Sequence, residues 1–214
     1  MPKPETFSIE VAREFVADPV LWPRLRGFLW DFAPLIHASW IEDPASPAAA
    51  ASPRVKAWVL ASLGVKPFFH AFPKEDWSRL ALLGGENLLD LCRWLGALAA
   101  SDALRRVTDG KTVHELKAAL PGVYPDVFGY ALYVPGLARM GIAAQTPQQV
   151  LEAGSDLLLA FLRNLPAPLL LRLKLQLPKP LVDRPSAASL RAVNPADLAK
   201  LLKLRFPEAY SLCC

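Results

Sequence analysis

The stretch from residue 76 to residue 107 decides the fold. It reads Asp76-Trp-Ser-Arg-Leu-Ala-Leu-Leu-Gly-Gly, then Glu86-Asn-Leu-Leu-Asp-Leu-Cys-Arg-Trp-Leu-Gly-Ala-Leu-Ala-Ala, then Ser101-Asp-Ala-Leu-Arg-Arg-Val107. Its residues favour helix, and the few charges recur at the spacing of one helix face. Gly84-Gly85 is expected to break or kink the helical region. No catalytic set of side chains lies in this stretch, so the strongest pattern of the chain predicts helix packing.

The same helical spacing recurs along most of the 214 residues. Helices are expected at about 7–17, within 20–41, and at 53–63, 112–120, 124–133, 146–165 and 194–204. The 21 prolines and 11 glycines indicate many helix stops and stiff connections. The sequence therefore predicts an all-α fold, with residues 1–214 in a single compact helical domain.

Several residues carry the pattern of helix N-terminal caps. Thr112 with Glu115, and Thr146 with Gln149, each fit a capping box. Ser101 is expected to cap the short helix that follows it, and Asn194-Pro195 to open the helix that reaches about residue 204.

Two segments are less regular. Leu171-Arg-Leu-Lys-Leu-Gln-Leu177 alternates with the period of a half-buried strand, yet its residues are good helix formers and none is β-branched. Residues 169–177 are therefore expected to be helical, with a short strand as the alternative. Residues 42–52 are rich in alanine, proline and serine and are expected to form a mobile surface loop.

A soluble, cytoplasmic protein is expected, because neither a signal peptide nor a membrane-spanning run is visible in the sequence. Hydrophobic residues make up 53% of the chain and charged residues 21%, which excludes a wholly disordered chain. The most apolar run, Leu80 to Ala100, carries three charges and is not expected to span a bilayer. Cys92 is expected to be a small buried apolar residue, and Cys213 and Cys214 to be exposed thiols.

Charge is unevenly distributed. Residues 160–205 contain nine basic residues and two acidic ones, a net charge of 9 − 2 = +7, whereas the whole chain carries +4. We predict that this basic C-terminal part contributes to one protein interface. The candidate partner-binding residues are Arg172, Lys174, Lys200, Lys203 and Arg205, with Trp22 as an exposed aromatic anchor.

The sequence offers little for catalysis or cofactor binding. His37, His70 and His114 are far apart, and no metal, nucleotide or nucleophile motif is present. The six tryptophans lie mostly among leucines and alanines, which favours core packing over a ligand cage. We therefore expect no enzyme, no cofactor and no metal. Nucleic-acid binding is not expected either, because the basic part lacks interleaved aromatic residues.

Two stretches carry a family resemblance. The first is Leu88-Leu-Asp-Leu-Cys-Arg-Trp-Leu-Gly-Ala-Leu98 with Ala103-Leu-Arg-Arg106; the second is Ala153-Gly-Ser-Asp-Leu-Leu-Leu-Ala-Phe-Leu162 with Pro166-Ala-Pro168 and Arg172-Leu-Lys-Leu-Gln-Leu-Pro178. In this order they resemble the K subunit of bacterial type III secretion systems, the SctK/YscK family. The resemblance covers residues 76–178 most closely, and its motifs are packing patterns.

The resemblance implies a non-enzymatic adaptor of the cytosolic sorting platform beneath the injectisome. Members of that family link the cytosolic forkhead-associated domain of the inner-membrane ring protein (SctD family) to the pod protein of the platform (SctQ family). Recruitment to the cytoplasmic face of the inner membrane follows from this role. The alternative function is a peripheral membrane-binding protein that uses the basic C-terminal face.

Overall fold

The computed structural model describes residues 21–29, 32–41, 52–65, 72, 77–184 and 193–214. These residues form helices and turns and no strand, so the all-α prediction is confirmed. The expected helix at 7–17 and nearly all of the expected loop at 42–52 lie outside the described residues.

The described residues form α-helices and short 3₁₀ helices along the chain. The N-terminal part contains α2 (Leu21–Leu29), the 3₁₀ helices η1 (Ala33–Leu35) and η2 (Ala38–Trp40), and α4 (Pro53–Ser62). The middle contains η3 (Trp77–Leu83), α5 (Gly85–Ala99), α6 (Ser101–Arg105), α7 (Gly110–Ala119), α8 (Val127–Tyr130) and α9 (Pro135–Ala138). The C-terminal part contains α10 (Pro147–Phe161), α11 (Ala167–Gln176), α12 (Lys179–Val182), α13 (Pro195–Arg205) and α14 (Pro207–Cys213).

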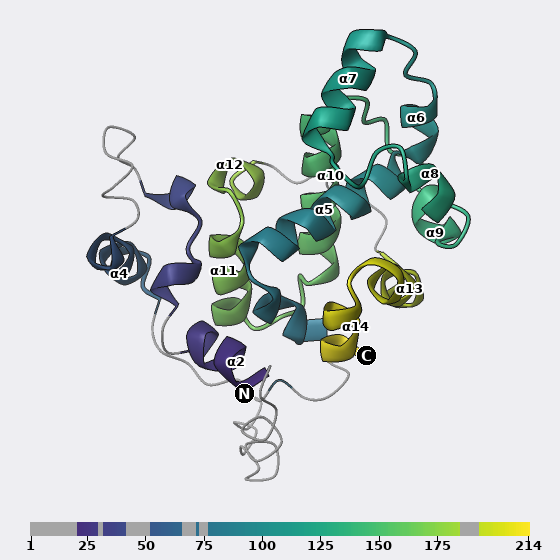
Figure 1. Cartoon of the computed structure of the whole chain (residues 1–214). Coiled ribbons are helices and arrows are strands. Elements are labelled where there is room, and N and C mark those ends of the chain that lie inside the picture. The colour runs from purple at the N-terminus through teal and green to yellow at the C-terminus, as the bar shows by residue number, and fades with distance from the viewer. Residues whose placement is uncertain (1–20, 30–31, 42–51, 66–71, 73–76, 185–192) are drawn as a thin grey trace.

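Helices α5 and α10 pack against each other at the centre of the molecule (Figure 1). They touch backbone to backbone at Gly96 and Gly154. A Cβ added to Gly96 would run into the carbonyl oxygen of Val150, and one added to Gly154 into that of Cys92. Only glycine at both positions permits this approach, so the two stretches that carry the family resemblance meet at the core of the fold.

Helix α5 is nearly surrounded by other elements. Its fully buried residues, such as Leu88, Leu91 and Leu95, recur three and four positions apart and face the core. Gly84 precedes the helix with a φ of 82°, a conformation that side-chain-bearing residues rarely adopt. The predicted break at Gly84-Gly85 is thus confirmed, and it separates the 3₁₀ helix η3 from α5.

The segment expected to be helical, 169–177, is helical through Gln176, and Leu177 ends the helix in an extended conformation. Leu169 and Leu173 are fully buried on the inner face of α11. The Gln176 side-chain amide donates to the carbonyl oxygen of Ala81 (2.9 Å), and the His37 backbone N–H donates to that of Leu175 (2.8 Å). Through these two hydrogen bonds, the C-terminal end of α11 is attached both to η3 and to the N-terminal part of the chain.

The C-terminal helix α14 packs against η3. Arg79, which is buried, donates to the carbonyl oxygens of Phe72 (2.8 and 3.0 Å) and Leu212 (3.2 Å). Charge-assisted hydrogen bonds of this kind are stronger than neutral ones. The sequence did not predict α14, although Pro207 occupies its first turn, a position that proline favours.

Two of the predicted caps are confirmed and two are wrong. Thr146 caps α10 in a capping box with Gln149, and the Asn194 side chain accepts from the Ala196 N–H. Helix α7 is capped by Asp109, which accepts from the Thr112 N–H (2.8 Å), because the helix begins earlier than its hydrophobic pattern indicated. Ser101 is buried and makes no capping hydrogen bond to α6.

Candidate functional site

An arginine on an aromatic platform lies at the end of α13. The guanidinium of Arg205 lies 4.6 Å from the ring centroid of Trp94 and 5.4 Å from that of Tyr130. Its hydrogen bonds to the Tyr130 hydroxyl and the Gly122 carbonyl are long, at 3.4 Å each. Among the described residues no carboxylate forms an ion pair with this exposed arginine. Arg205 therefore presents an oriented positive charge that a partner carboxylate can reach.

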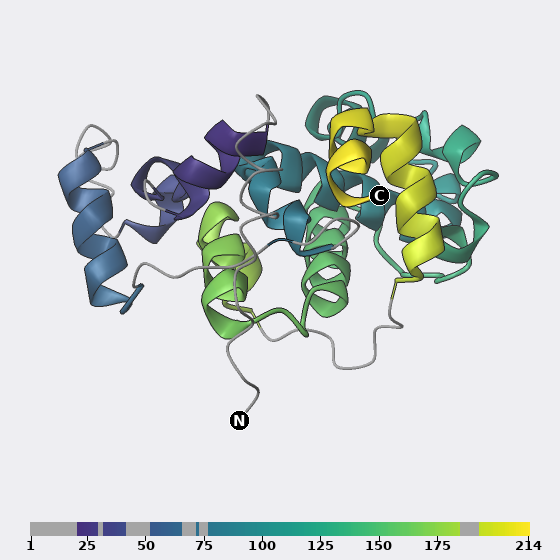
Figure 2. The same ribbon diagram turned by 90° about the horizontal axis from the view of Figure 1, so that it is seen from below.

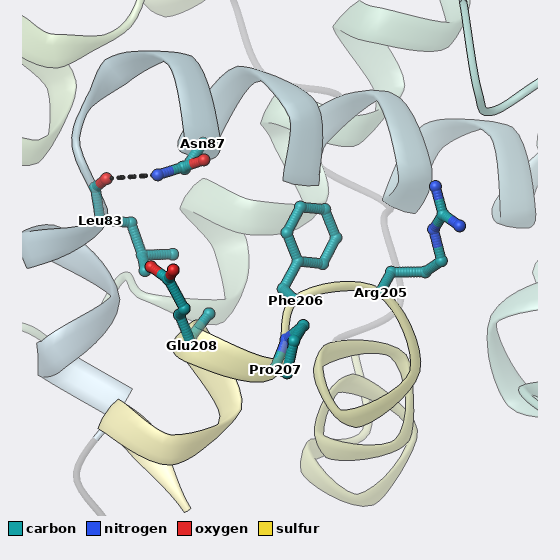
Figure 3. A pocket seen from close by; sticks show the side chains of 7 residues that line it. Leu83, Asn87, Arg205, Phe206, Pro207 and Glu208 are labelled. Carbon is teal, nitrogen blue, oxygen red and sulfur yellow. Dashed lines mark hydrogen bonds between the residues drawn. The ribbon is translucent and has the colours of Figure 1, made fainter.

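A pocket of about 250 Å³ adjoins Arg205. It is lined by Leu83, Asn87, Arg205, Phe206, Pro207, Glu208 and Ala209. Figure 3 shows Phe206 between Glu208 and Arg205 and the Asn87 amide donating to the Leu83 carbonyl oxygen (2.9 Å). Glu208 forms an ion pair with Arg24 of α2 (2.7 Å). The pocket thus combines apolar walls with a carboxylate at one end and a guanidinium at the other.

The sequence around Phe206 creates this pocket. The Phe206 N–H bonds to the Leu202 carbonyl oxygen (2.8 Å) and ends α13, and the Phe206 carbonyl accepts from the Tyr210 N–H (2.8 Å) within α14. Pro207 has no N–H and cannot continue the hydrogen bonding of α13. The two helices therefore meet at a single residue, and the angle between them leaves the pocket open.

Lys200 and Lys203 lie on the outer face of α13, as the interface prediction requires. Both are exposed. The Lys200 ammonium forms an ion pair with Asp197 on the same helix at 4.0 Å, and the Lys203 ammonium lies 5.9 Å from the Tyr210 ring centroid. With Arg205 these residues form what we call the α13 surface (Lys200, Lys203 and Arg205).

Arg172 does not belong to this surface, which corrects the prediction for that residue. Its side chain is 3% exposed, and its guanidinium donates to the carbonyl oxygens of Phe28 and Leu29 at the end of α2. It also lies 5.0 Å from the ring centroid of Phe32. Burial lowers the pKa of Arg172. Lys174, two residues later, is half-buried. The helical period turns Arg172 inward, where it joins α11 to α2.

Other basic residues of the C-terminal part are paired with acids. Arg184 forms ion pairs with Glu152 and Asp156 of α10, each at 2.7 Å. Lys179 lies 2.8 Å from Asp183. Two of these carboxylates precede residue 160 in the sequence, so the net charge of +7 counted along 160–205 does not form one continuous basic face. The membrane-binding alternative rested on such a face and loses its main support.

The tryptophans divide between the core and the surface. Trp94 is 1% exposed and packs edge-on against Tyr130, with 4.9 Å between ring centroids. Trp58 on α4 is 70% exposed, which the core-packing prediction missed. Trp22 lies in α2, but its side chain is outside the described residues, so its role as an anchor stays a prediction.

Burial shifts the pKa of two titratable groups in the N-terminal and central parts of the fold, Cys92 and His37. Burial raises the pKa of the Cys92 thiol to about 12, so it stays protonated at neutral pH. Cys213 is also buried, which corrects the expectation of an exposed thiol there, whereas Cys214 is exposed as expected. Burial lowers the pKa of His37, whose Nδ1 lies 2.8 Å from the Ser39 hydroxyl. The residues that the structure describes contain no group of three or more His, Cys, Asp or Glu side chains that could hold a metal ion.

Comparisons with other proteins leave the family open. No described helix is long and apolar enough to cross a membrane. No model of a known protein family, no curated protein and no solved structure matches this chain.

Proposed function

We propose that this protein is a non-enzymatic cytosolic adaptor of a type III secretion sorting platform. It would link the forkhead-associated domain of an SctD-family ring protein to an SctQ-family pod protein at the inner membrane. The observation that carries the proposal is the placement of the two stretches that resemble the SctK family. They form α5, most of α6, α10 and α11, and α5 and α10 contact each other backbone to backbone at Gly96 and Gly154.

The arrangement of surface elements is compatible with a bridging role. Helix α4 lies at one end of the molecule, and α13 and α14 lie toward the opposite end (Figure 2). The rigid core of α5 and α10 lies between them. Two partners that used these ends would not compete for the same surface, which is a geometric requirement for an adaptor.

The α13 surface is the better supported of the predicted contact sites. It combines two exposed lysines with an arginine oriented by Trp94 and Tyr130. Leu204, which is 46% exposed, adds an apolar side chain beside them. Positive charge around an apolar centre favours a protein partner whose surface is acidic.

The test is titration of the purified chain with each partner from its own secretion system. The two ligands are the cytosolic domain of the ring protein and the pod protein, each tagged separately. The proposal expects association with both, simultaneously in one complex. Association with neither would refute it, and binding to anionic vesicles in its place would favour the peripheral membrane-binding alternative.

Charge reversal tests the α13 surface within this proposal. The double variant Lys200→Glu/Lys203→Glu should weaken one of the two complexes and reduce the salt dependence of its association rate. The matched control is Lys111→Glu/Lys117→Glu on exposed positions of α7, which changes net charge equally. If both double variants lost equal affinity, the net charge of the protein, and not the α13 surface, would be responsible for the effect.

A further inference from the structure

Helix α4 exposes an apolar face that no described residue covers. Ala57, Trp58 and Ala61 are exposed and lie three and four positions apart, so they share one side of the helix. Leu63, just after the helix, is 42% exposed. Tryptophan supplies a large contact area and is enriched among the residues that dominate binding energy. A tryptophan that is 70% exposed therefore marks this face as a candidate contact surface.

The same helix has well-formed ends. Pro53 occupies its first turn. Gly64 follows it with a φ of 67°, its N–H bonds to the Ala61 carbonyl oxygen (3.0 Å), and the Val65 N–H bonds to that of Leu60 (2.9 Å). This pair of bonds is the Schellman motif that terminates helices at a left-handed glycine. Helix α4 is thus stopped at its C-terminal end by its own sequence.

Packing holds α4 on one side only. Its main neighbour is η1, and Lys56 donates to the Pro34 carbonyl oxygen there (3.3 Å). Leu60 and Val65 contact the core from half-buried positions. Figures 1 and 2 show α4 at the periphery of the helices, away from α5 and α10. A ten-residue helix is marginal by itself, so a partner on its open side would stabilise it further.

Charge restricts the kind of partner. Residues 32–41 and 52–65, which form the described part of this end, contain Arg54 and Lys56 and no carboxylate. Arg54 is exposed and lies four positions before Trp58, hence on the same side of the helix. No ion pair of Arg54 is found among the described residues. An apolar stripe with a cation at its N-terminal end is complementary to an apolar groove with carboxylates at its rim.

We propose that α4 docks as a helix into an apolar protein groove edged by carboxylates, with Trp58 filling the groove and Arg54 pairing at its rim. The inference rests on the proposed function, because the groove is taken to belong to one of the two platform partners. Arg54, Ala57, Trp58 and Ala61 occupy positions i, i+3, i+4 and i+7, the spacing by which a helix contacts a groove. The small side chains of Ala57 and Ala61 would let the wall of the groove approach the helix closely. This contact is separate from the α13 surface.

The experiment compares Trp58→Ala, Trp58→Phe and Arg54→Glu in the full chain. Each is titrated against the ring protein's cytosolic domain and against the pod protein. For one of the two, we expect Trp58→Ala to weaken binding by about 30-fold or more, and Trp58→Phe to restore most of it. Arg54→Glu should weaken the same complex, more at low salt than at high salt. The matched control is Tyr133→Ala, an equally exposed aromatic side chain between α8 and α9.

The outcomes separate this inference from the proposed function. If the wild-type chain binds a partner and Trp58→Ala binds both partners as tightly as wild type, α4 docking is wrong and the adaptor proposal stands. If the wild-type chain binds neither partner, both fail. A dimer of the chain, or adsorption to vesicles of phosphatidylcholine and phosphatidylglycerol, that disappears in Trp58→Ala would also overturn the proposal by assigning this face to a different occupant.

Discussion

The α5–α10 pair and helix α4 represent two ways in which a helix can be held in this molecule. In the α5–α10 pair, backbone meets backbone at Gly96 and Gly154, and α5 is buried over most of its surface. Helix α4 is held from one side and depends on its own end structures. The difference predicts that a small change in the first region affects the whole fold, whereas a similar change in the second stays local.

The largest expected effect is that of Gly154→Ala. The added Cβ would lie well inside van der Waals distance of the Cys92 carbonyl oxygen and 2.9 Å from the Gly96 nitrogen, and neither backbone atom can move independently of its helix. We expect a loss of about 3 kcal/mol or more in the free energy of unfolding, measured by urea denaturation.

Gly27→Ala is the matched control for this substitution. Gly27 lies within α2, and a Cβ there meets no atom within 4 Å. Alanine has the higher helix propensity, so this variant should be as stable as wild type or slightly more stable. Equal destabilisation by both variants would argue against the close contact of α5 with α10.

A second large effect is expected for Arg172→Met. Methionine retains much of the apolar stem but removes the donors that reach the Phe28 and Leu29 carbonyl oxygens. Leaving buried acceptors unsatisfied should lower the free energy of unfolding by about 2 to 3 kcal/mol. The exposed Arg163→Met should change it by less than about 0.5 kcal/mol. If Arg172→Met were equally neutral, the contact between α11 and α2 would contribute little.

Thr146→Ala tests the end of a packed helix. The threonine hydroxyl accepts from the Gln149 N–H, and the Gln149 side chain accepts from the Thr146 N–H. Loss of such a cap costs about 1 kcal/mol, and because α10 unfolds with the core, thermal denaturation should detect the whole cost. Thr146→Ser keeps the acceptor and should retain most of the stability. Similar losses in both would mean that the methyl group, and not the cap, is responsible.

The smallest global effect is expected for Gly64→Ala, which strains the end of α4. Its backbone is left-handed, and an L-residue there costs roughly 1 to 2 kcal/mol. Because α4 can open locally to release the strain, its amides should exchange hydrogen faster while global unfolding changes by less than about 0.5 kcal/mol.

Gly141→Ala is the matched control for the strain at Gly64. Gly141 has nearly the same φ (64°), and a Cβ there also meets no atom within 4 Å, but it lies between α9 and α10. We expect its full cost to appear in global unfolding. If both variants lowered global stability equally, α4 would be part of the cooperative core.

The sequence predicted the helices better than the faces they bury. Periodicity and caps located α10 and α13, because Thr146 and Asn194 stand directly before apolar repeats. Asp109 was missed because α7 begins on Gly110 and Lys111, which carry no hydrophobic signal. The very short α8 and α9 follow from local turns rather than from any repeat, and the expected helix at 124–133 was therefore too long.

The candidate site was harder to predict, because exposure depends on neighbours distant in sequence. Arg172 becomes buried only because α2, more than 140 residues earlier, packs over α11. The positive charge of Arg184 is paired with the carboxylates of Glu152 and Asp156 on another helix. Arg205 gains its orientation from Trp94 and Tyr130. A count of charge along the chain contains none of these relations.

The glycine contact between α5 and α10 also has a mechanical consequence. Neither helix can slide along or rotate against the other by even part of a turn without driving carbonyl oxygens and neighbouring side chains together at Gly96 and Gly154. The α5–α10 pair at the centre of the molecule therefore resists shear and should move as a single rigid body. A load applied at the α4 end would reach the α13 end as displacement of the whole body, with little of it absorbed by deformation between the two helices.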